Sequence, residues 1–296
     1  MLSPVVLYRN IEDDTQERDS CARLMPTTSF RSAIRPGSIV LGRYSVLPYY
    51  DELEKELSSR GSRLINSWRE HNFIADAIEW SGPGGALEGL TPRTWRYDEL
   101  VNLPEGSYIL KGRTNSRKTQ WATHMFAATR ADVPVVASRL YDDPFILQQG
   151  LVVREYIPLR KLDNGLNGLP ITNEWRTFWL VVNGIPIMLC YGYYWASHPE
   201  RLDAASFPGE ATEIAFKAAV RISDHANFFV LDLAETQDGR WVVVEVNDGQ
   251  MSGLSMCSAE ELYSNMADAL RTIGGPRYSQ DDDLPSALCI ESVAQW

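Results

Sequence analysis

The alternation of apolar and polar positions predicts short strands and helices in succession along most of the chain. Near the start, the apolar runs PVVLY and GSIVLG are typical of buried strands. The stretch YYDELEKELSSRG places Leu53 and Leu57 one helical turn apart and ends at Gly61, so it predicts an amphipathic helix. The turn-rich stretch SGPGGALEGLTP follows. We therefore expect residues 1–100 to form a small α/β lobe.

Two further units and a tail are expected after this lobe. Residues 101–160 show a strand at SYILKG, a polar loop at RTNSRKTQ, a helix at WATHMFAATRA and the strand-like runs VPVVAS and GLVVREYI. In residues 161–275, two β-rich runs meet at the hairpin signal Asn183-Gly184. The strand FFVLDLAE lies between predicted helices, which are expected at 210–223 and 258–273. The tail, 276–296, carries prolines and a charge run, so we expect it to be loosely ordered.

The strand RWVVVEVNDG carries polar side chains among its valines. Because successive strand side chains point to opposite faces, Trp241, Val243, Glu245 and Asn247 are expected to share one face. The remaining valines are expected on the other face. A carboxylate and a carboxamide two residues apart on so apolar a strand indicate a site rather than packing.

The pair Asp238-Gly239 predicts a two-residue type I′ turn before this strand. Such a turn sets Asp232 directly opposite Glu245, with Cβ atoms roughly 4.5–5.5 Å apart, a relation in which like charges are destabilising. One interpretation is an exposed face on which both acids project into water. The other is an oxygen-ligand set for Mg²⁺ formed by the two acids and Asn247. Apolar neighbours on the expected face favour the metal; they are Phe228, Val230 and Val243.

Composition narrows the classes of partner. The formal net charge is −11, whereas surfaces that bind nucleic acids or anionic membranes are usually basic. No apolar run approaches membrane-spanning length and no secretion signal is recognisable, so we expect a cytoplasmic protein. The four cysteines and four histidines lack metal-ligand spacing, and neither a Gly-Lys-Ser/Thr phosphate loop nor a dinucleotide fingerprint is present. These patterns favour a small-molecule or protein partner.

The spacing of Asp232, Glu245 and Asn247 resembles the metal-binding set of the ATP-grasp superfamily. The resemblance extends over about residues 60–272 and is closest to poorly characterised members from phages and bacteria. It implies an α/β (α+β) protein of ATP-grasp architecture, in which the small N-terminal lobe precedes two α+β subdomains that clamp ATP. The cofactors it implies are ATP and Mg²⁺.

Three upstream segments follow the order of the superfamily. SYILKG resembles the strand that ends in a phosphate-binding lysine, here Lys111. LVVREYI resembles the hinge whose backbone holds adenine, and EWRTFWLVVNG the strand in which Glu174 would bind ribose and Arg176 phosphate. The hinge and the loop after Lys111 would add further nucleotide-binding residues, namely Glu155, Tyr156, Ile157, Ser116, Arg117 and Lys118.

Each of these segments also has a simpler interpretation. Lys111 could be a solvated charge at a strand edge, and RTNSRKTQ a polar turn. Glu174 and Arg176, two residues apart on one strand face, could form a structural ion pair.

Just beyond the metal strand, DGQMSGL resembles the loop that receives the substrate carboxylate, although a plain turn is the alternative. Its candidate substrate-binding residues are Asp248, Gly249, Ser252 and Gly253. The chain also departs from the superfamily pattern. Where many relatives have a further phosphate-contacting lysine, INSWREHNFIADAIEW has none, so that Arg69 or His71 would replace it or the contact is absent. An insertion at 160–173 would be a lid or a recognition loop.

The resemblance implies a ligase that joins a carboxylate to an amine through an acyl phosphate, with amino acids or peptides as the expected substrates. Lys111 and Arg176 would stabilise the charge that develops during phosphoryl transfer. Two alternatives use the same scaffold: an ATP-dependent small-molecule kinase, and a nucleotide-binding module without turnover. The acid, the amine and the oligomeric state are left open by the resemblance.

Overall fold

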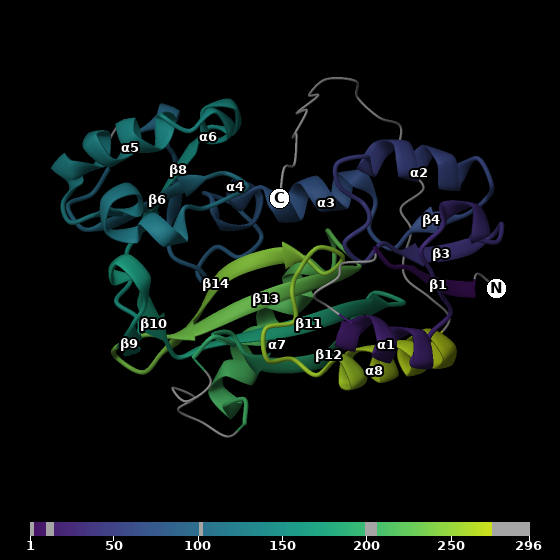
Figure 1. The fold of residues 1–296 in the computed structure, drawn as a ribbon. Coiled ribbons are helices and arrows are strands. Elements are labelled where there is room, and N and C mark those ends of the chain that lie inside the picture. The colour runs from purple at the N-terminus through teal and green to yellow at the C-terminus, as the bar shows by residue number, and fades with distance from the viewer. Residues whose placement is uncertain (1–2, 10–14, 101–102, 199–205, 274–296) are drawn as a thin grey trace.

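The computed structural model describes residues 3–9, 15–100, 103–198 and 206–273. It contains a parallel sheet near the N-terminus, a small antiparallel sheet, a two-stranded hairpin and a large antiparallel sheet. In Figure 1 the large sheet lies between the N-terminal lobe and the unit built on the small sheet. The predicted tail at 276–296 lies outside the described residues.

The N-terminal lobe is a four-stranded parallel sheet in the order β2-β1-β3-β4. Its apolar strands alternate with helices, as the sequence predicts for an α/β lobe. The strands are β1 (Ser3–Leu7), β2 (Thr27–Thr28), β3 (Ser38–Leu41) and β4 (Arg63–Leu64), and the helices are α1 (Thr15–Leu24) and α2 (Tyr50–Ser58). Leu53 and Leu57 of α2 are buried against the sheet, which confirms the predicted amphipathic helix.

Helices α3 (Trp68–Ala75) and α4 (Ala77–Ser81) lead from this lobe to the small sheet. The small sheet has the order β5-β8-β6-β7 and is antiparallel. Its strands are β5 (Thr94–Arg96), β6 (Tyr108–Gly112), β7 (Phe126–Ala127) and β8 (Leu151–Glu155), covered by α5 (Val133–Tyr141) and α6 (Pro144–Gln149). The insertion forms a small hairpin, β9 (Lys161–Asn164) with β10 (Pro170–Thr172).

The large sheet has the order β12-β11-β13-β14, with antiparallel neighbours throughout. Its strands are β11 (Glu174–Val182), β12 (Ile185–Tyr193), β13 (Phe228–Glu235) and β14 (Trp241–Asp248). Helix α7 (Gly209–Ile222) packs on one face, while α8 (Ala259–Ile273) and α1 lie on the other. The predicted helices at 210–223 and 258–273 and the Asn183-Gly184 hairpin are confirmed, the two turn residues having φ values of 53° and 78°.

Two predicted elements of the small unit are wrong. VPVVAS is the start of helix α5, because Pro134 fits the first helical turn and the buried side chains of Val133, Val136, Ala137 and Leu140 follow helical spacing. WATHMFAATRA is a single π-helical turn at Trp121–Met125 followed by β7, which pairs with β6. Within the described residues, no helix combines the length and apolar character needed to span a bilayer.

Candidate functional site

The β13–β14 hairpin places Asp232 opposite Glu245, as predicted, but by a different route. The turn is not the predicted two-residue turn. Thr236 pairs with Arg240 across three residues, and only Gly239 adopts a positive φ, of 82°. This longer turn shifts the pairing by one residue. A β-bulge that leaves Val244 without a partner shifts it back, so that Asp232 and Glu245 face each other.

The same bulge changes which residues share a face of β14. Trp241, Val243 and Val246 all pack in the core under α7. Glu245 and Asn247 instead line a cavity on the opposite face. The prediction that Trp241 and Val243 share the face of Glu245 is therefore wrong, because the extra residue breaks the two-residue alternation.

Asp232 is fully buried and accepts two hydrogen bonds from one guanidinium. Arg176 Nε and Nη2 donate to its two carboxylate oxygens, both at 2.8 Å, and Arg176 Nη1 donates to the Gly253 carbonyl at 2.7 Å. Burial opposes the charge of Arg176, but Asp232 outweighs it and the net effect raises the pKa of Arg176. Arg176 thus pairs with Asp232, rather than with Glu174 as the simpler interpretation of this strand held.

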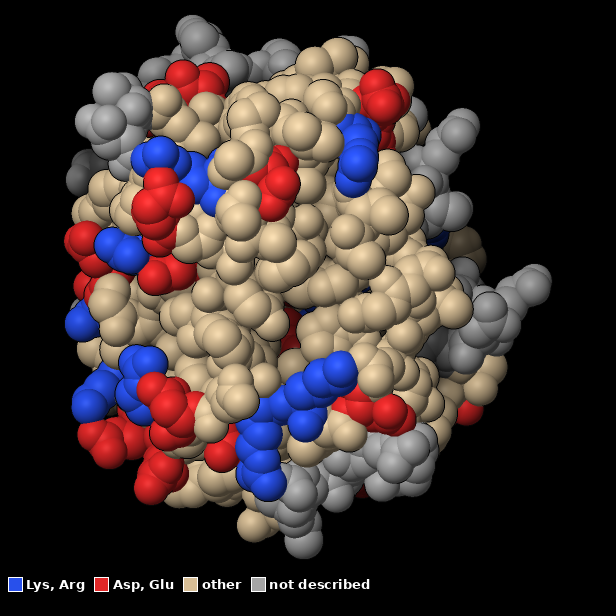
Figure 2. All heavy atoms as spheres, turned by 90° about the vertical axis from the view of Figure 1, so that its left-hand side faces the viewer, with Lys and Arg blue, Asp and Glu red and all other residues tan. Residues whose placement is uncertain are grey.

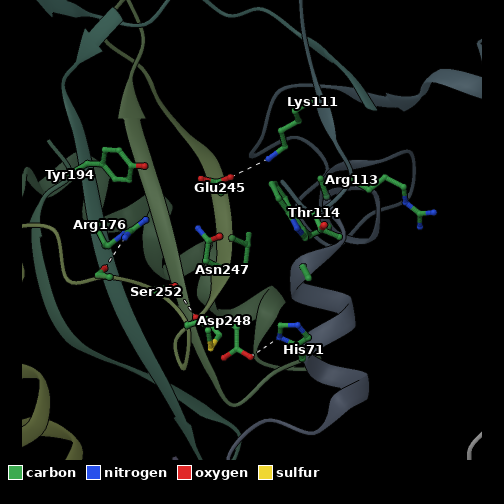
Figure 3. Close-up of a pocket in the computed structure, with 16 residues that line it drawn as sticks. His71, Lys111, Arg113, Thr114, Arg176, Tyr194, Glu245, Asn247, Asp248 and Ser252 are labelled. Carbon is green, nitrogen blue, oxygen red and sulfur yellow. Dashed lines mark hydrogen bonds and ion pairs between the residues drawn. The ribbon is translucent and has the colours of Figure 1, made fainter. Parts of the chain in front are cut away.

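Glu245 lies between two lysines from different segments. Lys111 Nζ, at the end of β6, donates to Glu245 Oε1 at 3.1 Å, and Lys118 Nζ lies 3.5 Å from Oε2 (Figure 3). Burial alone would raise the pKa of Glu245, yet the two ammonium groups hold it well below its usual range. Burial lowers the pKa of Lys111, whereas that of Lys118 is raised because Glu245 outweighs its burial.

Tyr194, which follows β12, connects the two charged pairs. Its hydroxyl accepts a hydrogen bond from Lys118 at 2.8 Å. Its ring centroid lies 4.9 Å from both the Lys118 ammonium and the Arg176 guanidinium carbon, a cation–π arrangement. Two lysines, one arginine and two acids therefore meet between the small and the large sheet.

Two cavities share Lys111 and Glu245 in their walls. The first is an apolar cleft of about 190 Å³ between the small sheet, the β9–β10 hairpin and β14. It brings together seven of the predicted nucleotide-binding residues, which are Lys111, Ser116, Lys118, Glu155, Tyr156, Ile157 and Glu174. On the side of the hairpin, Figure 2 shows a narrow hollow with acidic atoms visible at its base.

The apolar walls of this cleft come from segments on both sides. Ile109 and Met125 contribute from the small sheet and its connection, and Leu169 from the insertion. Glu174 is buried at its inner end with only the Thr172 hydroxyl as a side-chain donor, at 3.3 Å, and burial raises its pKa to about 7 although Lys118 opposes the shift. The cleft combines a flat apolar space with a buried acid and two lysines.

The second cavity, of about 360 Å³, is polar and lies on the side of α3. Figure 3 shows Arg176, Asn247 and Asp248 around it. Four of the predicted residues of the substrate and phosphate regions line this cavity, namely Arg176, Asp248, Ser252 and Gly253. Asn247 lines it as well, with its Nδ2 3.5 Å from Asp232 Oδ2.

Two predicted site residues are not brought to either cavity. Arg117 pairs with Asp143 beside α6. Gly249 is packed on the Phe228 ring and its carbonyl accepts from Arg43, so it supports the loop from behind. Of the two suggested replacements for the missing lysine, His71 lines the polar cavity and Arg69 lines neither.

Three site residues were missed in the sequence. His71 lies on α3, after the Ser67–Glu70 capping box, a pattern that predicts a helix start but not the direction of the imidazole. Tyr194 was set aside as core within YGYYW. Arg154 of β8 donates to the carbonyls of Val243, at 3.3 Å, and Val244. No local pattern signals these contacts, because each joins segments far apart in the chain.

Comparison with known proteins gives the family. Residues 99–266 match the sequence model of an ATP-grasp domain, the third family of its clade. The chain belongs to this ATP-grasp family. The ATP-grasp fold expected from the sequence is thereby confirmed. Among curated proteins no sequence match is found.

Solved structures share the ATP-grasp fold at low sequence identity. D-cycloserine synthetase DcsG is 15% identical over 90% of this chain and 99% of its own, with a TM-score of 0.59. The ATP-grasp ligase PsnB, complexed with a phosphomimetic variant of a minimal precursor, Mg and ADP, is 12% identical over 91% of this chain and 99% of its own, with a TM-score of 0.50. The chain spans half the length of an L-amino acid ligase from Bacillus licheniformis, at 16% identity, 74% coverage of this chain and a TM-score of 0.47.

The ATP-grasp site has the donors that Mg²⁺ requires. Asp232 and Glu245 face each other across two strands, and Asn247 reaches the same carboxylate. Mg²⁺ prefers oxygen ligands and is usually held by one or two carboxylates together with phosphates and water. Within the described ranges, no group of three or more acids, histidines and cysteines suited to a metal is found, so the set is two acids and an amide. These residues fit the ion.

Proposed function

We propose that this ATP-grasp protein is an ATP-dependent ligase that joins a carboxylate to an amine and releases ADP and phosphate. The observation that carries the proposal is the shared wall of the two cavities. Lys111 and Glu245 border both the apolar cleft, which suits a nucleotide, and the polar cavity, which suits a small polar substrate. A γ-phosphate at this wall would meet a substrate carboxylate from the other side.

In the first step, a carboxylate oxygen of the acid attacks the γ-phosphorus, the bond to the β-phosphate oxygen breaks and ADP leaves with the electron pair. Lys111, Lys118 and Arg176 are proposed to neutralise the phosphate oxygens, since catalysis of phosphoryl transfer is mainly positioning and charge stabilisation. Asp232, Glu245 and Asn247 would hold Mg²⁺, which neutralises charge on the nucleotide phosphates when bound.

In the second step, an amine attacks the acyl phosphate and phosphate leaves. Amino acids or peptides are the proposed substrates. This choice is supported by PsnB, which is complexed with a precursor variant, and by the polar lining of the second cavity, where Ser252 and Gly253 would receive the acid. The backbone of Glu155, Tyr156 and Ile157 is proposed to hold adenine, with Glu174 at the ribose.

The test is ADP release from MgATP in the presence of a library of amino acids and short peptides. Substrate-stimulated release that is lost in Glu245→Ala, by about a hundredfold or more, is expected, since one preorganised charge contact is worth about 10²–10³ in rate. Glu213→Ala is the matched control, because Glu213 is an exposed acid of α7 paired only with Lys217.

Other outcomes contradict the proposal in distinct ways. A phosphorylated product that accumulates and persists without any amine identifies a kinase. Nucleotide binding by the wild type without ADP release under any condition of the library identifies a binding module.

A further inference from the structure

Asp248, predicted to contact substrate, has both carboxylate oxygens engaged by the protein. Oδ1 accepts hydrogen bonds from Asn66 Nδ2 and from the Gln250 backbone N–H, both at 2.9 Å. Oδ2 lies 2.9 Å from His71 Nδ1, and only 3% of the side chain is exposed. Asp248 therefore acts on the cavity through His71 rather than by direct contact with a ligand.

His71 is held in one orientation by this bond and by aromatic neighbours. Its ring stacks on Trp68, with centroids 5.5 Å apart, and lies 4.7 Å from the Tyr50 ring. Because the ionised Asp248 can only accept, the proton of the neutral imidazole is assigned to Nδ1. Nε2 then carries the lone pair.

The Nε2 atom is available to a ligand. Among the described residues no hydrogen-bond partner is found for it, and His71 lines the polar cavity (Figure 3). The other charged groups on the cavity wall lie toward the phosphate side or are paired. They are Lys111 with Glu245, Arg176 with Asp232 and Arg113 with Asp76. His71 thus offers an oriented acceptor without a partner.

We propose that His71 is the general base that deprotonates the amine in the second step of the ligase reaction, with Asp248 as its positioning residue; this inference rests on the proposed function. The amine nitrogen forms a bond to the acyl carbon, the carbon–oxygen bond to phosphate breaks, and phosphate leaves with the electron pair. The proton lost by nitrogen passes to His71 Nε2. Asp248 stabilises the imidazolium that forms.

The two half-reactions separate this role from the rest of the site. Hydroxylamine, which is largely unprotonated at neutral pH, captures an acyl phosphate as a hydroxamate without needing a base. Each of the twenty amino acids is supplied with MgATP and hydroxylamine, and in parallel with the mixed amino acids as the amine. Hydroxamate, ADP and amide are measured.

His71→Asn keeps a donor toward Asp248 but removes Nε2. We expect the kcat of amide formation to fall about 10²-fold, as for loss of a general base, with hydroxamate formation and KM for the acid unchanged. His225→Asn is the matched control, since His225 stacks on Phe73 outside both cavities. Asp248→Asn, which would turn a donor toward Nδ1 and move the ring proton to Nε2, should show the same split.

The outcomes are distinguishable. Wild-type protein that forms no hydroxamate with any acid overturns the proposed ligase itself. Hydroxamate from the wild type, together with equal loss of hydroxamate and amide in both folded variants, overturns the base role, as does full retention of amide formation. A rise in the KM for the amine with unchanged kcat overturns it too, because it indicates recognition alone.

Discussion

Glu174 is a buried acid whose charge state is set by its surroundings. It is 6% exposed, lacks an ion-pair partner in direct contact, and burial raises its pKa to about 7. At pH 6 the carboxyl is therefore largely protonated, and above pH 7 it is ionised. Only the ionised group can accept hydrogen bonds from two ribose hydroxyls at once.

We therefore predict that nucleoside binding strengthens as the pH rises from 6 to 8. Adenosine is the ligand of choice, because it has no phosphate that titrates in this range. Its affinity for the wild type should rise about tenfold, as one charge-assisted hydrogen bond of about 1.5 kcal/mol would give. Glu174→Gln should show an affinity that does not change with pH. Calorimetry at both pH values checks this, and an equal rise in the variant would contradict the role of Glu174.

The bulge in β14 shows what can and cannot be predicted at the level of an element. The opposition of Asp232 and Glu245 is predicted correctly because a longer turn and a bulge displace the register in opposite directions. The face of Trp241 is predicted wrongly, since only the bulge decides it. The bulge is stabilised from outside the hairpin, by Arg154 of β8, so local sequence does not contain its cause.

Arg154 links the two sheets at this bulge. It is 8% exposed, its guanidinium donates to the carbonyls of Val243 and Val244, and burial lowers its pKa to about 10. Arg154→Met keeps the aliphatic stem but leaves these carbonyls without their donor. We predict a loss of about 1–3 kcal/mol in the free energy of unfolding and weaker ATP binding.

Urea unfolding and calorimetry test this prediction, with Arg93→Met as the control. Arg93 is a largely exposed arginine that pairs with Glu155 on the surface, so its replacement should cost at most about 1 kcal/mol. Equal losses in the two variants would show that the link between the sheets is not made through the bulge.

At the scale of the molecule, a buried ion pair joins the N-terminal lobe to the substrate loop. Glu17 of α1 and Arg43 after β3 both have fully buried side chains, with Arg43 Nη2 2.6 Å from Glu17 Oε1. Arg43 Nη1 donates to the carbonyls of Ser252, at 3.0 Å, and Gly249. Tyr263 of α8 donates to the same carboxylate at 2.7 Å. The loop beside the polar cavity is therefore held from behind.

Removing one partner should be worse than removing both. Glu17→Ala leaves Arg43 buried without its acid, and we predict a loss of about 3–5 kcal/mol in unfolding free energy by urea denaturation. The double variant Glu17→Met, Arg43→Met should recover most of this stability while requiring more acid substrate for ADP release, because the loop carbonyls lose their donor. A double variant as unstable as the single one would contradict this prediction.

The long-range contacts define what the sequence could not supply. The order of the segments and their residue types predict the ATP-grasp fold and most of the cavity-lining residues. The pairing of Arg176 with Asp232 and the direction of His71 depend on how separate units pack. Such contacts carry no periodic signal along the chain.

The core beneath the large sheet has a practical consequence for dissecting the protein. Its apolar cluster takes Val6 and Ile39 from the first lobe together with Phe178 and Leu262 from the last unit. The portion that carries the family match, 99–266, therefore owns only one side of that interior. Excised, it would turn a greasy surface to water, so chimaeras between relatives have to exchange the opening lobe along with the nucleotide-clamping half.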